Sequence, residues 1–331
     1  MGTFLTNPRM NRALSDRVRA SIRRGRSRGA RVDRRLTAAF RVVALVGIAL
    51  ALISLSVLRK RADDELEQAR KSLLDTVSQK RAQLSGDDLL TVDRVVNVLL
   101  RAPGPYEGDR LANDVRGSEA FSALLERPIL YVRGPIEAFK GEDELRRATL
   151  LSYPDAFVRC LVDPPRARTE KALLERVRGS SEHPAPSAQV HRLYDLLSGF
   201  PLLQSAWKTR VKDVSRVRDL SPLERELRAA KLDETIAAAR ARLVLFVLDE
   251  PGVSGGPTEL DGERAHDVRV TLFDLEQRTA LLRLRRHVDP GTFSDRGRAG
   301  HASGLDACAL SLDVREAVAK GDALTVATPA R

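Results

Sequence analysis

Residues 42–58 read VVALVGIALALISLSVL, seventeen consecutive residues without a charged side chain. A helix rises about 1.5 Å per residue, so this run spans about 25 Å, and residues 36–40 extend it past Arg41. Arg41 can keep its guanidinium at the headgroup level because its aliphatic stem lies along the helix. A buried helix of a soluble protein normally carries a polar stripe, and this run carries none. The stretch therefore predicts a single transmembrane helix over residues 39–58.

The charges on the two sides of this helix predict its orientation. Twelve Arg lie between Arg9 and Arg41, against only Asp16 and Asp33, whereas the other side begins with just three basic residues, 59–61. The positive-inside rule then predicts a basic, disordered cytoplasmic tail over residues 1–38, able to attract anionic lipid headgroups. No small-residue cleavage pattern follows the apolar run, so we expect an uncleaved signal-anchor in the inner (cytoplasmic) membrane and an extracytoplasmic C-terminal domain.

The net charge of +11 does not indicate a nucleic-acid-binding domain. Residues 1–61 carry fifteen basic and two acidic side chains, or +13, so the remaining 270 residues sum to −2. A nucleic-acid-binding domain carries its basic excess on the folded body, where it follows the phosphates. Only nine of the 56 basic residues are Lys, a skew typical of GC-rich bacterial genomes.

The rest of the chain predicts an α+β fold, with a mostly helical ectodomain and a small antiparallel sheet. Apolar positions at alternating spacings of four and three, from Ala62 to Thr76, predict an amphipathic helix at the start of a juxtamembrane helical stalk over residues 59–101. A first α+β lobe is expected over 103–178, a linker near 179–187, a second lobe over 187–320 and a flexible tail over 321–331.

The second lobe is predicted to combine a helical hairpin with three strands. Ser221 and Glu224 fit a capping box, with Pro222 at the first helical position, which predicts a helix from 221 to about 242. Residues 243–248 (LVLFVL) predict a buried strand, and the alternating runs 268–272 and 282–286 predict a β-hairpin. A helix over 304–319 is expected to cover the resulting antiparallel sheet.

No catalytic motif withstands inspection. Gly252-Val253-Ser254-Gly255-Gly256 matches G-x-S-x-G, but no helix pattern follows it, so a loop is the better interpretation. The five His show no paired metal-ligand spacing, and we predict neither a metal nor a cofactor. The weak catalytic candidates are His287, Asp289 and His301, in a polar group that also contains Asp295 and Asp306.

Two other features have alternative interpretations. Cys160 and Cys308 are the only cysteines, and outside the cytoplasm such a pair can form a disulfide or remain two buried thiols. In the anchor, small residues fall on one helix face, which suits helix pairing and a homodimer, although spanning helices are rich in small residues anyway. These residues are Ala44, Gly47, Ala51 and Ser54.

Taken together, these features predict a membrane-anchored cell-envelope protein that contacts the lipid bilayer through residues 42–58 and binds or scaffolds another envelope protein. The alternative is a membrane-anchored envelope enzyme, a hydrolase by class. An enzyme is expected to gather acids, His or Ser in one cleft, whereas a binding domain exposes apolar side chains.

Overall fold

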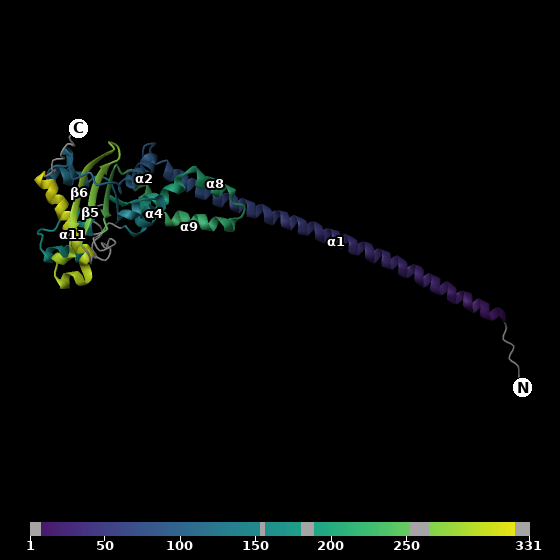
Figure 1. Cartoon of the computed structure of the whole chain (residues 1–331). Coiled ribbons are helices and arrows are strands. Elements are labelled where there is room, and N and C mark those ends of the chain that lie inside the picture. Colours follow the sequence, from purple (N-terminus) through teal and green to yellow (C-terminus); the bar gives the residue numbers. More distant parts are fainter. Residues whose placement is uncertain (1–7, 153–155, 180–188, 252–264, 322–331) are drawn as a thin grey trace. The chain divides into compact units, whose positions relative to one another are not determined.

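The computed structural model describes residues 8–152, 156–179, 189–251 and 265–321 (Figure 1). The chain divides into two compact units, Met1–Gln68 and Ala69–Arg331. One helix, α1 (Pro8–Arg81), forms the described part of the first unit and continues into the second. The predicted linker at residues 180–187 and the predicted flexible tail at 322–331 lie outside the described residues.

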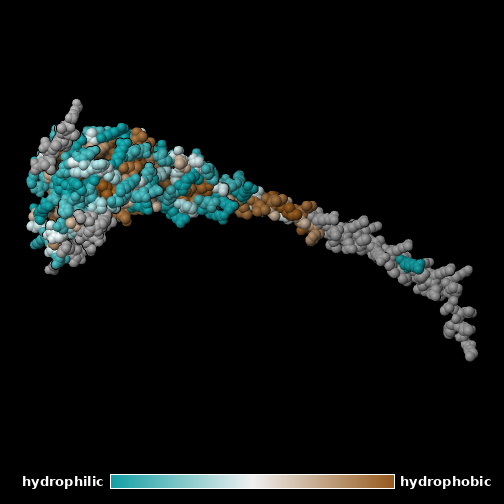
Figure 2. Space-filling view, viewed as in Figure 1, coloured by the Kyte–Doolittle hydropathy of each residue, from teal (hydrophilic) through white to brown (hydrophobic). Residues whose placement is uncertain are grey.

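In the first unit, α1 carries the apolar run. From Val43 onward, α1 is the one described helix that is long and apolar enough to cross a membrane by its length and composition. Its large apolar side chains are exposed, for example Leu45 at 65% and Leu52 at 62%. Figure 2 shows this stretch as a brown band along the helix.

The Arg-rich segment differs from its prediction. Residues 1–38 are predicted to be disordered, whereas α1 begins at Pro8 and runs through the whole Arg-rich segment. Arg and Ala, which dominate this segment, are both good helix formers, and this propensity accounts for the difference.

In the second unit, helices surround one sheet. The α-helices after α1 are α2 (Thr91–Arg101), α3 (Ser118–Leu125), α4 (Glu142–Leu151), α5 (Ala156–Val162), α6 (Glu170–Gly179), α7 (Leu193–Gly199), α8 (Ser205–Asp213), α9 (Ser221–Ala229), α10 (Leu232–Ala239) and α11 (Asp295–Lys320). The strands are β1 (Arg110–Leu111), β2 (Ile129–Pro135), β3 (Val190–Arg192), β4 (Leu243–Asp249), β5 (His266–Asp274) and β6 (Thr279–Val288). Short 3-10 turns include η1 (Asp88–Leu90), η4 (Phe200–Leu203), η5 (Val217–Leu220) and η6 (Pro290–Thr292).

The described strands form one mixed sheet in the order β1-β6-β5-β4-β2-β3, so the prediction of a small antiparallel sheet is wrong. The β4-β5-β6 part is antiparallel as expected, but β2 pairs in parallel with both β3 and β4. A long, largely helical crossover between β2 and β4 brings the chain back in the same direction, which a hydrophobic pattern cannot reveal. β1 and β3 have two and three residues, too few for a period to show.

The sheet joins the two predicted lobes. β1 and β2 come from residues 103–178, while β3 to β6 come from residues 187–320, and all of them lie in one sheet. The Pro- and Ser-rich composition at 179–187 predicts a break in regular structure, but it carries no information about pairing between strands on either side. Strands from both predicted lobes therefore belong to one six-stranded sheet.

Helices cover both faces of the sheet. On the first face, alternating residues of β2, β4, β5 and β6 pack with α3, α5 and α11 in one buried cluster that includes Tyr131, Phe157, Val247 and Leu310. We call this the α11 face. The rings of Tyr131 and Phe157 stack with centroids 6.4 Å apart. On the opposite face, Phe246 and Leu248 are buried, and α2 lies on this side in Figure 1.

Residues 69–81 at the end of α1 belong to the second unit and pack within it. Leu73 and Val77 are buried, whereas Thr76 of the predicted apolar seam is exposed. Arg81 donates a hydrogen bond to the Leu203 carbonyl. The turn that follows is closed by reciprocal bonds, Ser85 N to Asp88 Oδ2 at 2.8 Å and Asp88 N to Ser85 Oγ at 3.2 Å. Residues 69–81 of the predicted amphipathic helix therefore pack against the rest of the second unit.

The helix predicted over 221–242 is two helices. α9 ends at Ala229 and α10 begins at Leu232, with Lys231 between them in the left-handed region at φ 43°. Ser221 already has helical backbone angles and its side chain forms no cap, so the predicted capping box is absent. The 3-10 turn η5 leads directly into α9, which removes the extended backbone that a capping Ser needs.

Candidate functional site at the carboxyl edge of the sheet

Polar and charged side chains meet at one edge of the sheet. The parallel strands β2 and β4 both end there, β5 begins there and β6 ends there. In sheets with parallel strands, this carboxyl edge is the usual position of ligand and active sites. Four ionisable side chains are buried at this edge on the α11 face, none more than 6% exposed, and we call them the carboxyl-edge cluster: Arg133, Asp249, His266 and Asp306.

Arg133 and Asp249 form the centre of the cluster. Arg133 of β2 lies opposite Val247 of β4, and Asp249 follows two positions later on the same face, so the parallel pairing brings the two side chains within reach of each other. The Arg133 guanidinium donates from Nη2 to Asp249 Oδ1 at 3.1 Å and from Nε to Oδ2 at 3.4 Å. Both side chains are at most 5% exposed, so each ion depends on the other for compensation.

His266 begins β5 and shares the same carboxylate. Its Nε2 lies 3.3 Å from Asp249 Oδ1, and its side chain is 2% exposed. Asp249 therefore accepts contacts from both a guanidinium and an imidazole in a buried setting. This arrangement fixes the orientation of the imidazole ring.

Asp306 reaches the cluster from α11. Burial raises the pKa of the Asp306 carboxyl to about 7, while the positive charges of His266 and Arg133 oppose that shift and the negative charge of Asp289 adds to it. A carboxyl with such a pKa can hold or release a proton close to neutral pH. The cluster is thus able to transfer a proton, or to make the contact between α11 and the sheet depend on pH.

A second group of charges lies on the opposite face of the same edge. Arg269 and Arg285 each form an ion pair with Glu250, and Arg285 also contacts Asp267 at 3.0 Å. Asp267 in turn lies 2.9 Å from His287 Nδ1. His266 and His287 therefore lie on opposite faces, because Asp267 rather than His266 is the register partner of His287.

The structure separates the catalytic candidates predicted from the sequence. His287 is largely exposed and pairs with Asp267, while Asp289 caps η6 by accepting a hydrogen bond from Gly291 N at 2.8 Å. His301 lies in α11, but its side chain falls outside the described residues, as does Ser254. Among the described side chains of the predicted polar group, Asp306 alone belongs to the carboxyl-edge cluster.

Three members of the cluster were missed by the sequence analysis. Arg133 lies in β2, and Asp249 and His266 end β4 and begin β5, on either side of the connection between these two strands. Their signal is position: Arg133 is two residues before the end of β2, Asp249 ends β4, and His266 begins β5 at the same edge of the sheet. That signal can be used only once the parallel pairing of β2 and β4 is known.

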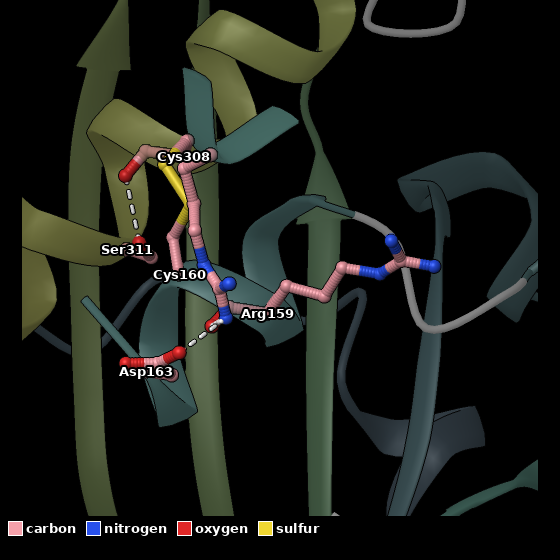
Figure 3. The surroundings of a disulfide bond; sticks show 6 residues. Arg159, Cys160, Asp163, Cys308 and Ser311 are labelled. Atoms are coloured by element: carbon pink, nitrogen blue, oxygen red, sulfur yellow. Dashed lines mark hydrogen bonds and ion pairs between the residues drawn. A yellow bond between two sulfur atoms is a disulfide. The ribbon is translucent and has the colours of Figure 1, made fainter. Parts of the chain in front are cut away.

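Cys160 and Cys308 are joined by a disulfide, with their α-carbons 5.2 Å apart. Cys160 lies on α5 and Cys308 on α11, and both are fully buried, together with Leu173 and Leu305. Figure 3 shows the bond between the two helices, with Ser311 donating to the Cys308 carbonyl at 2.7 Å. The disulfide holds α11, the helix that carries Asp306, against α5 on the same face of the sheet.

Within the described residues, no group of three or more His, Cys, Asp or Glu side chains is arranged to hold a metal ion. The carboxyl-edge cluster contains one buried ion pair, one imidazole, and one carboxyl whose pKa burial raises to about 7. Comparison with protein-family models, with curated proteins and with solved structures finds no match for this chain.

Proposed function

We propose that this chain is a membrane-anchored cell-envelope protein whose folded domain lies outside the cytoplasm and binds another protein. In this proposal, residues 42–58 contact the lipid bilayer, the Arg-rich tail contacts anionic headgroups inside the cell, and nucleic acid is not a ligand. The observation that carries the proposal is the Cys160–Cys308 disulfide in a chain whose helix α1 contains a strongly apolar stretch. Disulfides persist in oxidising compartments and are rare in the cytosol, which supports an extracytoplasmic domain.

Paired reporter fusions test the orientation. Alkaline phosphatase and a green fluorescent protein, each fused after residue 331, report opposite sides of the cytoplasmic membrane. We expect an active phosphatase and a dark fluorescent fusion, together with an oxidised cysteine pair on non-reducing electrophoresis. A fluorescent fusion with an inactive phosphatase would overturn the placement of the domain.

Protein binding is supported by an exposed apolar pair. Leu150 and Leu151 end α4 and are 48% and 70% exposed. They lie next to the edge strand β3, whose Arg192 donates to the Leu150 carbonyl at 3.4 Å. Exposed apolar side chains beside an edge strand of the described sheet suit an interface in which a partner covers both.

A photo-crosslinking amino acid at position 151 tests this contact in living cells. We expect a discrete higher-mass adduct from position 151 and none from Lys171, an exposed position on α6. Leu151→Arg should remove an adduct formed from position 150 while the domain stays folded. Equal labelling from positions 151 and 171 would count against the binding surface.

We also propose that two copies pair through the small-residue face of the anchor, Ala44, Gly47, Ala51 and Ser54. Nothing lies within 4 Å of a Cβ built on Gly47, so this face is open along α1. Energy transfer between donor- and acceptor-labelled copies in vesicles should fall in Gly47→Ile and persist in Ala49→Ile, on the other side of the helix. Unchanged transfer in Gly47→Ile would exclude this face.

An envelope hydrolase is the second candidate, and one observation favours it: Asp306 has a pKa near neutrality and shares a buried edge with His266. Asp306→Asn distinguishes the two functions. A binding protein should keep its crosslinked adduct and its cellular role in this variant. Loss of the role, with fold and membrane level unchanged, would favour the hydrolase.

A further inference from the structure

A cavity of about 360 Å³ lies on the face of the sheet opposite α11. Its floor consists of side chains from β4, β5 and β6, including Phe246, Thr271 and Ala280, and its wall comes from the end of α2 and the segment after it. We call this segment, residues 102–109, the strap. The volume lies within the range of small-molecule sites, about 300–1,000 Å³.

Polar contacts hold the strap in place, so the cavity is formed before any ligand arrives. Arg269 donates to the Gly104 carbonyl at 2.6 Å, and Arg286 pairs with Asp109 at 2.6 Å. The Tyr106 ring lies beneath Arg269, whose Cζ is 5.5 Å from the ring centroid. A preformed site does not need to order a loop when the ligand binds, which favours affinity.

The lining is apolar at its floor and cationic at its rim. Phe246 and Phe273 bring two aromatic rings to the floor, while Arg101, Arg269 and Arg283 line the cavity against a single acid, Glu107. Glu250 compensates Arg269, and Glu107 pairs with Arg283.

Two donors remain available at this rim. Arg101 is exposed, and none of the described side chains forms an ion pair with it. The Nε atom of Arg283 is buried and has no hydrogen-bond acceptor in the described part of the chain. A buried donor of this kind favours a ligand that supplies an acceptor.

We propose that this cavity binds a small amphipathic carboxylate with its apolar ring system on Phe246 and Phe273 and its carboxylate against Arg283 and Arg101. Aromatic faces favour a flat apolar group, and guanidinium groups match the geometry of a carboxylate. The neutral amide of the same ring system keeps an acceptor but lacks the negative charge, and the amine carries the wrong charge. The site is independent of the protein partner proposed above.

The test uses the full chain in lipid nanodiscs and three probes with one ring system: 2-naphthylacetate, 2-naphthylacetamide and 2-(2-naphthyl)ethylamine. Binding is followed by saturation-transfer NMR of the probes, with empty nanodiscs to subtract partition into lipid. Since charge-assisted bonds are roughly twice as strong as neutral ones, we expect the acetate to bind about tenfold tighter than the amide. The amine should not bind measurably.

Variants locate the site. Ala280→Phe fills the cavity and should weaken acetate binding at least about tenfold, as expected when a side chain takes the place of the ligand. Arg101→Gln leaves the fold intact because the side chain is exposed, and it should reduce the preference for acetate over amide several-fold. The matched control is Arg116→Gln, at another exposed Arg, which should leave the preference unchanged.

Either of two results would overturn the proposal. The first is equal affinity for the three probes in the unaltered chain. The second is an unchanged acetate preference in Arg101→Gln, a result that does not depend on whether Ala280→Phe folds. Neither result bears on the reporter fusions or the crosslinking at position 151, so failure of this inference and failure of the proposed function are distinguishable.

Discussion

The two faces of the sheet carry the same kinds of charged residue in different surroundings. On the α11 face, Arg133 and Asp249 are buried with His266 and Asp306, and a disulfide holds the covering helix in place. On the opposite face, Arg283 pairs with a Glu107 side chain that is 72% exposed, beside a cavity. A buried pair is costly to break, whereas an exposed pair contributes little. The charges of the α11 face are enclosed between the sheet and α11, whereas Arg283 and Glu107 on the opposite face border a cavity.

Removing the disulfide is expected to have the largest effect. The bond joins residues 148 positions apart, and closing a loop of that length stabilises the fold by on the order of 4–5 kcal/mol through the entropy of the unfolded chain. The double variant Cys160→Ala/Cys308→Ala should lose stability on that scale in urea unfolding. Trp207, the single Trp and a buried residue, reports the transition by fluorescence. A loss below about 1 kcal/mol would show that α11 is held by packing alone.

Arg133→Met should have the next largest effect on the same face. It leaves the Asp249 carboxylate buried beside only one imidazole, and breaking a buried pair in this way costs about 3–5 kcal/mol. The double variant Arg133→Met/Asp249→Leu is the control, since it removes both charges and should recover part of the loss. If the single variant unfolds at the same urea concentration as the unaltered chain, the cluster does not hold the edge together.

The raised pKa of Asp306 should appear in the pH dependence of stability. Its folded pKa is raised from 3.8 to about 7, so between these values the folded state keeps a proton that the unfolded state has lost. Stability from this group is therefore present below about pH 4 and is lost as the pH rises toward 7, at up to about 1.4 kcal/mol per pH unit. Comparing Asp306→Asn with the unaltered chain at several pH values isolates this slope. Parallel curves for the two proteins would contradict the raised pKa.

Arg283→Gln, on the opposite face, should have the smallest effect. Arg283 is 21% exposed, but its partner Glu107 is 72% exposed, so we expect loss of this ion pair to change the free energy of unfolding by less than about 1 kcal/mol. The informative quantity is the ratio to Arg133→Met, measured under identical conditions. Similar losses for the two variants would abolish the distinction between the faces.

The sequence predicts elements better than it predicts the site. The run LVLFVL is a strand, as its local pattern predicts. The apolar stretch 42–58 lies in a helix long enough for a bilayer, and its pattern is also local. The parallel pairing of β2 with β4 depends on the crossover between them, and Arg133 meets Asp249 only through that pairing. Asp306 looks like an ordinary polar position in a helix, because sequence does not show that α11 turns it toward the sheet. Site residues therefore followed from topology, not from a motif.

The register of the central strands has a consequence for how the domain is made. Ile129 pairs with Leu243, 114 positions later, so the middle of the sheet cannot assemble until most of the chain has been synthesised. Contacts so distant in sequence slow folding and leave early strands exposed in the meantime. The apolar strand β2 then needs protection from aggregation until β4 has been synthesised and can pair with it. We expect this domain to fold late, after its synthesis is nearly complete, and to depend on holding chaperones until then.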